Sequence, residues 1–474
     1  MTILKTAPPI GRQAAPRRSP ARFWGLLLIL GTSLAWGVAR FAGFSSSVAL
    51  ISVASFVLAV VGLWRPPLGL LSVGVLCTID PLLRTYLLTG GLFRWNTLNY
   101  FLILVAVLFL PTLVAARDAP TRLLEALLLV LAVGLAYSAG VKEGIQHMVG
   151  ATAYFGLRVY VDRARGTASI WFWLAVVSGF VGAGAGLAYN LEPAQVQEII
   201  NPNAWVFCPL TFLFLGCIAL WAEPVSTGRQ FILGALAMVN LAWIFLSGSR
   251  GGLLIGLVCL AFMATRPSAR SLRVMIAAGV ALVGSVLTTL FAAQQGNSLH
   301  RIDKMFDSNY SWSGRTSGRY DLARGGWEIF LDHPLTGVGT GGFSKSWAQL
   351  RDVEGLSTFR LGLESEAHAG WVKTLSENGI PGILLHVAFV GSFAFLGWKG
   401  RRRGGLPFGV VVSAILAAAF VSTEFQGKAL WLEAAIAASL LSRPPRWRAG
   451  SAVNRARSSS GERPGRGVRL VASR

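Results

Sequence analysis

The side chains best suited to chemistry belong to one histidine and a small set of arginines. His368 follows Glu366 by two positions in a polar stretch before an apolar segment. An imidazole titrates near neutral pH and can accept a proton from a hydroxyl, and a neighbouring carboxylate can orient it. Arg250, Arg315 and Arg319 each carry a guanidinium, which can bind phosphate oxygens through two hydrogen bonds. These residue types indicate proton transfer beside an anion. The alternatives are a surface histidine, arginines that contact lipid headgroups and solvated carboxylates.

The chain that must position these side chains has the composition of a membrane protein. Of its 474 residues, 53% are hydrophobic and only 14% are charged. A soluble protein carries about 25% charged residues. Apolar segments of roughly 20 residues, the length that crosses a bilayer, follow one another along most of the sequence. The sequence therefore predicts an all-α polytopic membrane protein with about 12–14 transmembrane helices, and excludes an ordinary soluble enzyme.

Charge and hydropathy together divide the chain into five parts. We expect a basic cytoplasmic tail at 1–22, a transmembrane bundle at 23–293, a large periplasmic loop with short helices at 294–379, further transmembrane helices at 380–442 and a disordered, Arg-rich cytoplasmic tail at 443–474. Basic tails of this kind face anionic lipid at the cytoplasmic surface. Neither tail matches a folded nucleic-acid module, so membrane lipids are expected partners and nucleic acid is not.

The short loops agree with a cytoplasmic N-terminus. This orientation places the Arg- and Lys-rich segments 117–122, 162–165, 266–273 and 399–403 on the cytoplasmic side, as the positive-inside rule requires. It places the turn at 247–250 and the long loop on the outer side, where the rule expects few cations. The arginines found there indicate an anionic ligand.

The long loop contains a recognisable helix and turn. Tyr320, Ala323, Trp327 and Phe330 recur at three- and four-residue intervals, which predicts a short amphipathic helix that lies on the membrane domain. Pro334 and the glycines that follow are expected to end it in a tight turn. These glycines spell GxGxxG, but they follow a helix and not a strand, so we do not expect a dinucleotide site.

No metal or cofactor is expected. The cysteines Cys77, Cys208, Cys217 and Cys259 lie inside apolar segments without metal-ligand spacing, and they are predicted to be small buried residues. No cluster of His, Asp and Glu has the spacing of a metal site either.

Several stretches, in order, resemble the O-antigen ligase and O-antigen polymerase superfamily. They are Leu246-Ser-Gly-Ser-Arg-Gly-Gly, then Ser317-Gly-Arg leading to Trp327 and His333-Pro-Leu-Thr-Gly-Val-Gly, and finally Glu366-Ala-His-Ala-Gly-Trp followed by Glu377-Asn-Gly-Ile-Pro-Gly. A weaker match is Asn201-Pro-Asn-Ala. The motifs cover about residues 200 to 400. The chain departs from the family at Ala369, where relatives often carry Asn.

The resemblance implies a glycosyltransferase of the bacterial inner membrane. Members of this superfamily move a glycan from a polyprenyl diphosphate carrier to an acceptor hydroxyl on lipid A core, on a growing polysaccharide or, in some relatives, on a protein. For this chain, the resemblance implies His368 as the base. It implies Arg250 and Arg319, with Arg315 and Glu366 beside them, as substrate-binding residues.

The sequence leaves other functions open. A polymerase for O-antigen or exopolysaccharide would share this chemistry with a ligase. A lipid-linked glycan transporter would need ionisable residues near mid-span and two repeated halves, and no internal repeat is evident. A non-catalytic scaffold that recruits partners through its basic tails would give the arginines and the histidine no role.

Overall fold

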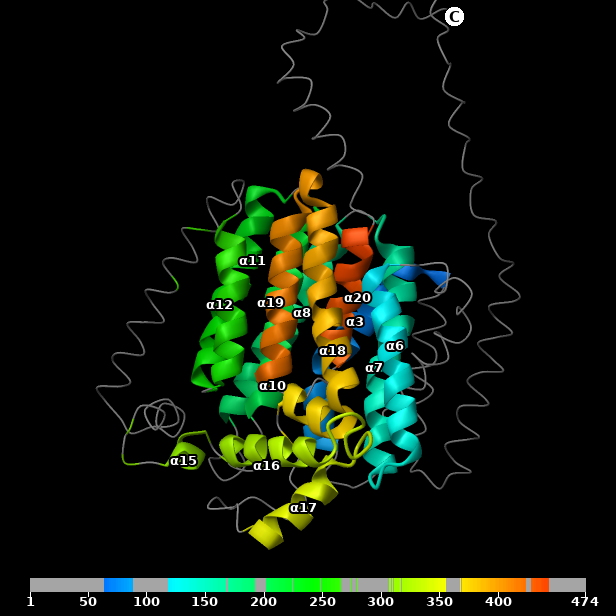
Figure 1. Cartoon of the computed structure of the whole chain (residues 1–474). Coiled ribbons are helices and arrows are strands. Elements are labelled where there is room, and N and C mark those ends of the chain that lie inside the picture. Colours follow the sequence, from blue (N-terminus) through cyan, green and yellow to red (C-terminus); the bar gives the residue numbers. More distant parts are fainter. Residues whose placement is uncertain are drawn as a thin grey trace, which may run out of the picture.

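The chain is all-helical throughout the part that its computed structural model describes (Figure 1). That part comprises residues 64–87, 118–167, 169–191, 202–223, 225–247, 249–265, 273, 279, 307, 309, 311–316, 318–354, 367, 369–422 and 428–442. The helices are α3 (Pro66–Leu87), α6 (Ala119–Ala136), α7 (Val141–Ala164), α8 (Ile170–Leu191), α10 (Pro202–Ala222), α11 (Thr227–Leu246), α12 (Arg250–Ala264), α15 (Trp312–Thr316), α16 (Arg319–Asp332), α17 (Phe343–Glu354), α18 (Gly370–Lys399), the 3-10 turn η2 (Arg401–Arg403), α19 (Gly405–Ser422) and α20 (Lys428–Ser442).

The helices form a membrane-spanning bundle, as the sequence predicts. Within the described residues, the segments long and apolar enough to cross a bilayer are Ala119–Ala136, Ile170–Leu187, Thr227–Leu246 and Gly370–Lys399. Shorter apolar helices include α12, α19 and much of α10 and α20. The four cysteines are all buried among these helices, which agrees with their assignment as small buried residues.

Contacts between helix termini define the two ends of the bundle. At one end, Trp221 of α10 donates through Nε1 to the carbonyl of Gly404 at 3.1 Å, and its ring stacks on Phe408 of α19. This end also carries the basic residues Arg401 and Arg402, and we call it the basic end. At the opposite end, α16 lies across the bundle and α17 extends beyond it (Figure 1). We call this the arm end.

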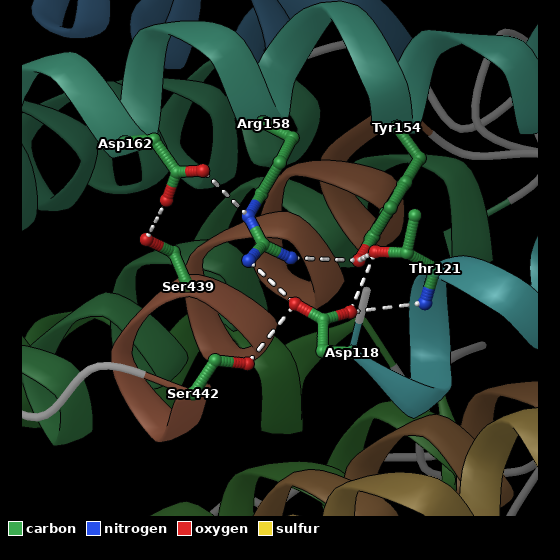
Figure 2. A network of polar contacts seen from close by, with 7 residues as sticks. All are labelled: Asp118, Thr121, Tyr154, Arg158, Asp162, Ser439 and Ser442. Atoms are coloured by element: carbon green, nitrogen blue, oxygen red, sulfur yellow. Dashed lines mark hydrogen bonds and ion pairs between the residues drawn. The ribbon is translucent and has the colours of Figure 1, made fainter. Parts of the chain in front are cut away.

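A buried ionic network joins three helices at the basic end (Figure 2). Arg158 of α7 donates through Nη2 to Asp118 at 2.6 Å and through Nε to Asp162 at 3.2 Å. Asp118 also caps α6, because its carboxylate accepts from the amide of Thr121 at 3.1 Å. Ser442 of α20 donates to Asp118 at 3.0 Å, and Ser439 donates to Asp162. The guanidinium thereby connects α6, α7 and the last turns of α20.

The arm consists of α16, the glycine turn (residues 333–342) and α17. Helix α16 is present where its periodicity predicts it, but the predicted contact face is wrong. Tyr320 and Trp327 are about half exposed, whereas the buried face carries Leu322, Gly325, Gly326 and Ile329. A Cβ at Gly325 would lie 2.3 Å from Trp347, and one at Gly326 would lie 2.3 Å from Val372. The glycines select the face because they allow the closest approach of neighbouring elements.

Helix α18 begins at Gly370, earlier than the Ile380 that hydropathy predicts, and it is broken at Gly379. Gly379 has φ +59° and ψ −155°, which no helix contains, and Pro381 follows. Nearly every residue of the first half, 370–378, is buried. This half is polar, and so hydropathy alone does not detect it. It packs against α6 and the arm, since a Cβ at Gly134 would lie 2.9 Å from Asn378 and one at Gly326 would lie 2.3 Å from Val372.

Candidate functional site

The described parts of the motif stretches lie at one end of the bundle, the arm end. Helix α18 runs from the arm to Lys399, beside the basic end where α10 terminates, so the start of α10 lies at the arm end. The start of α12 lies there too, because a Cβ at Gly252 would be 2.3 Å from the Val206 side chain of α10. The motif residues Arg250 and Arg319 are therefore on one end of the molecule, with the two neighbours of His368.

Two serines shape the turn that precedes Arg250. Ser247 ends α11, and its hydroxyl donates to the carbonyl of Ile244 at 2.6 Å. Ser249 is the N-cap of α12, and its hydroxyl accepts from the amide of Gly252 at 3.3 Å. Ser is favoured at this position because it satisfies an amide that has no partner inside the helix. Arg250 is the first residue of α12, at the positive end of the helix dipole, which favours anions.

The remaining candidate arginines lie on the arm. Arg319 is the first residue of α16 and is partly buried. Gly318 precedes it with φ +80°, a left-handed conformation that L side chains rarely adopt, so a glycine turns the chain into α16 here. Arg315 belongs to α15, and its guanidinium lies 5.2 Å from the ring centroid of Trp312. Both arginines therefore lie at the arm end, but on different helices.

The two residues on either side of His368 in the sequence lie in an apolar, packed cluster. Ala367 and Ala369, on either side of it, are buried in a cluster with Leu322 of α16 and Phe343 and Trp347 of α17. Ala369 is the N-cap of α18, and it makes no side-chain hydrogen bond there. The side chain of Arg250 and the whole of Glu366 and His368 lie outside the described residues. The sequence prediction for these groups therefore stays a prediction.

The glycine turn packs against the hairpin between α6 and α7. Gly337, Gly339 and Gly341 have φ of +64°, +89° and +87°. A Cβ at Gly341 would lie 2.3 Å from the carbonyl oxygen of Gly140, so a larger residue would separate the two segments. Thr340 is fully buried and donates to the carbonyl of Leu131 in α6 at 2.9 Å. The predicted tight turn is present, and its glycines serve close packing as well as conformation.

Tyr137 adds a polar contact to this packing. Its hydroxyl donates to the carbonyl of Thr336 at 2.7 Å. Partial burial raises the pKa of Tyr137, and the contact with Thr336 opposes this effect. Because the ordinary pKa of tyrosine is already near 10, the phenol stays protonated at neutral pH and remains a donor. Lys345, at the start of α17, donates to the carbonyl of Ala139 in the same hairpin.

The break in α18 lies against the same turn. Ser376 and Glu377 cannot use their carbonyls within the helix in the usual way, because Gly379 diverts the backbone and Pro381 has no amide hydrogen. Val338 and Gly339 of the glycine turn donate to these two carbonyls, each at 2.9 Å. In return, Ile380 donates to the carbonyl of Pro334 at 2.9 Å. The broken helix and the turn thus satisfy one another's backbone groups.

Sequence reasoning gave no role to the buried polar side chains of the first half of α18. Lys373, Glu377 and Asn378 are 4%, 1% and 2% exposed. Asn378 lies with its Oδ1 2.8 Å from the Thr340 hydroxyl, and Glu377 accepts from the amide of Phe343 at 3.3 Å. The available signal was a cluster of polar residues directly before a proline-initiated span.

Comparison with known families gives one match. A family model described as O-antigen ligase matches residues 233–387. This match supports a resemblance between that region and the O-antigen ligase and polymerase superfamily. The matched region runs from α11 into the second half of α18 and contains all the candidate site residues, Arg250, Arg315, Arg319, Glu366 and His368. No curated protein matches the chain. The match supports a membrane enzyme of the glycan-transferring ligase or polymerase type.

Proposed function

We propose that this protein is a ligase that transfers a glycan from a polyprenyl diphosphate carrier to an acceptor hydroxyl, on lipid A core or a similar molecule, at the outer face of the inner membrane. The observation that carries the proposal is that the starts of α12, α16 and α18 all lie at the arm end, opposite the basic end. The positive-inside rule assigns the basic end, with Arg401 and Arg402, to the cytoplasm. The arm end then faces the periplasm, where carrier-linked glycans are used.

The proposed reaction uses one base and several cations. The imidazole of His368 takes the proton of the acceptor hydroxyl while the hydroxyl oxygen attacks the anomeric carbon of the glycan. The bond between that carbon and the diphosphate oxygen breaks, and polyprenyl diphosphate leaves. Arg250 and Arg319, with Arg315 nearby, stabilise the negative charge that develops on the leaving group. Glu366 orients the imidazole. Attack opposite the leaving group inverts the anomeric configuration.

The glycan profile of a deletion strain tests this proposal. The strain is complemented with the wild-type gene, with the His368→Ala variant or with an empty vector, and both surface glycans and carrier-linked glycans are compared. If the protein is a ligase, long carrier-linked chains should accumulate in the deletion strain and in the strain with the variant, and these chains should not reach lipid A core. Single repeat units in place of long chains would identify a polymerase. An unchanged profile in every strain would contradict both and favour transport or scaffolding.

A further inference from the structure

The carboxylate of Glu377 connects the broken helix α18 to the start of α17. Glu377 is 1% exposed, and its Oε1 accepts from the amide of Phe343 at 3.3 Å. Phe343 is the first residue of α17, so its amide has no acceptor inside its own helix. No acidic residue lies in the first turn of α17. Glu377 therefore supplies from another helix the acceptor that this helix N-terminus lacks.

The backbone of Glu377 binds the other side of the same turn. Its carbonyl accepts from the amide of Gly339 at 2.9 Å, because Pro381 provides no amide hydrogen within α18. A Cβ at Gly337 would lie 2.2 Å from the carbonyl carbon of Glu377, so the two backbones are in direct contact. Glu377 thus contacts the middle of the glycine turn through its carbonyl and the start of α17 through its side chain.

The elements held by Glu377 are those that carry the candidate site. The glycine turn follows α16, which begins with Arg319. The ring of Phe343 packs in the buried cluster that contains Ala367 and Ala369, the neighbours of His368. The amide of Phe343 contacts Glu377, and its side chain lies in the same buried cluster as the two neighbours of the proposed base. Any shift of α17 relative to α18 would move that segment.

We propose that Glu377 is a positioning residue for the transfer reaction: its buried carboxylate fixes the arm on the broken helix α18 and thereby places the segments of Arg319 and His368. This inference rests on the proposed function. Lys373, one helical turn earlier and also buried, carries the opposite charge on the same face of this half-helix. The role is indirect, and Glu377 itself does not contact the reacting atoms.

Hydrogen exchange of the purified full-length protein tests the attachment directly. We compare exchange over residues 336–345 in the wild type, Glu377→Ala, Glu377→Gln and the control Asp332→Asn, which removes an exposed carboxylate from the same arm. Loss of a hydrogen bond to a charged group predicts at least about tenfold faster exchange at Phe343 in Glu377→Ala. Gln keeps an oxygen acceptor, so Glu377→Gln should show smaller acceleration. The control should match the wild type.

Kinetics per folded molecule separate positioning from a purely structural role. In Glu377→Ala, displacement of the reacting groups by roughly 1 Å predicts a kcat about 100-fold lower, with the KM for the lipid-linked donor little changed. Glu377→Gln should recover most of this loss. If Glu377→Ala fails to fold, the Glu377→Gln variant tests the positioning role by itself. It should show faster exchange at Phe343 and a lower kcat than Asp332→Asn.

Several results would overturn the inference. One is unchanged exchange over residues 336–345 in both Glu377 variants. Another is wild-type kcat per folded molecule in a variant with reduced abundance, which would make the contact structural only. A wild-type protein without transfer activity would instead contradict the proposed function, and the exchange comparison would still decide whether Glu377 fixes the glycine turn.

Discussion

Arg319 is the candidate cation whose position is best defined among the described residues. It begins α16 directly after the left-handed Gly318, at the arm end and partly buried. A guanidinium at the end of a packed helix loses little freedom when it binds an anion, whereas the same group on a mobile loop must first be ordered. Arg315 stacks on an exposed tryptophan and belongs to a helix of only one to two turns. We therefore expect Arg319 to contribute more to the stabilisation of the leaving group.

The first prediction concerns this difference. Arg319→Ala should lower kcat by about 100-fold, because loss of one group that stabilises developing charge costs roughly that factor. Arg319→Lys should recover only part of the activity, since an ammonium lacks the paired donors of a guanidinium. Arg324→Ala, on the exposed face of the same helix, serves as the control. Transfer from a lipid-linked donor by purified protein measures the effect, and equal loss in Arg324→Ala would contradict it.

Hydropathy predicts the helices that are apolar along their whole length. It does not predict the helices whose buried faces are polar. Hydropathy predicts α8, α11 and α19 closely, because their side chains meet lipid or other helices throughout. It misses the first half of α18, where polar residues such as Lys373 and Glu377 are buried within the protein. It also misses α17, because that helix is polar overall even though Phe343, Trp347 and Leu350 recur at helical spacing on its packed face. Local pattern cannot report burial that depends on a distant segment.

The same limit applies to contact faces and to the basic end. The periodicity of α16 predicts a helix, but Gly325 and Gly326 decide which side packs. The ionic network around Arg158 joins residues far apart in sequence, Asp118 and Ser442 among them, and no spacing rule pairs them. The candidate site residues were found by motif order, whereas Glu377 required the geometry of the glycine turn.

The second prediction concerns the ionic network at the basic end. Arg158→Met should destabilise the protein by about 3–5 kcal/mol, because it leaves the buried carboxylate of Asp118 and the partly buried carboxylate of Asp162 without their cation. Thermal unfolding in detergent measures the loss. The combined variant Asp118→Asn, Arg158→Met and Asp162→Asn should lose less than Arg158→Met alone. Arg122→Met, which removes an exposed arginine from the same end, is the matched control and should unfold like the wild type.

The third prediction concerns the start of α18. Ala369 occupies the N-cap position with an extended backbone, φ −145° and ψ 123°, and provides no side-chain acceptor. Asn at this position should stabilise the helix by about 1 kcal/mol, because its side chain can accept from an amide of the first turn. This also gives a physical reason for the Asn that relatives often carry. A rise in melting temperature for Ala369→Asn, but not for Ala369→Val, is the expected result. A lower melting temperature for the Asn variant would contradict the capping argument.

For the molecule as a whole, the two ends of the bundle have opposite chemical character. The basic end carries exposed arginines in η2 and the buried ionic network, and the arm end carries the motif stretches and aromatic residues such as Trp312 and Trp327. A membrane protein with this asymmetry is oriented by its cationic end. We therefore expect the arm to face the periplasm.

The fourth prediction tests that orientation with introduced thiols. The native cysteines are all buried, so a single exposed cysteine can be labelled selectively. Leu335→Cys, at a position 69% exposed in the glycine turn, should react with a membrane-impermeant maleimide in cells whose outer membrane alone is permeable. Arg402→Cys, exposed in η2, should react only after the inner membrane is opened. The reverse pattern would place the arm in the cytoplasm and contradict the proposed reaction.

The central claim, that this molecule transfers a carrier-linked glycan with His368 as the base, is tested most directly by reconstitution. Purified wild-type protein and the His368→Ala variant are placed in liposomes with a polyprenyl diphosphate-linked glycan and a lipid A core acceptor. We predict that the wild type forms the glycan–acceptor conjugate and releases polyprenyl diphosphate. We predict that a folded His368→Ala variant does so at least about 100-fold more slowly. Equal rates in the two proteins, with both correctly folded, would contradict the account.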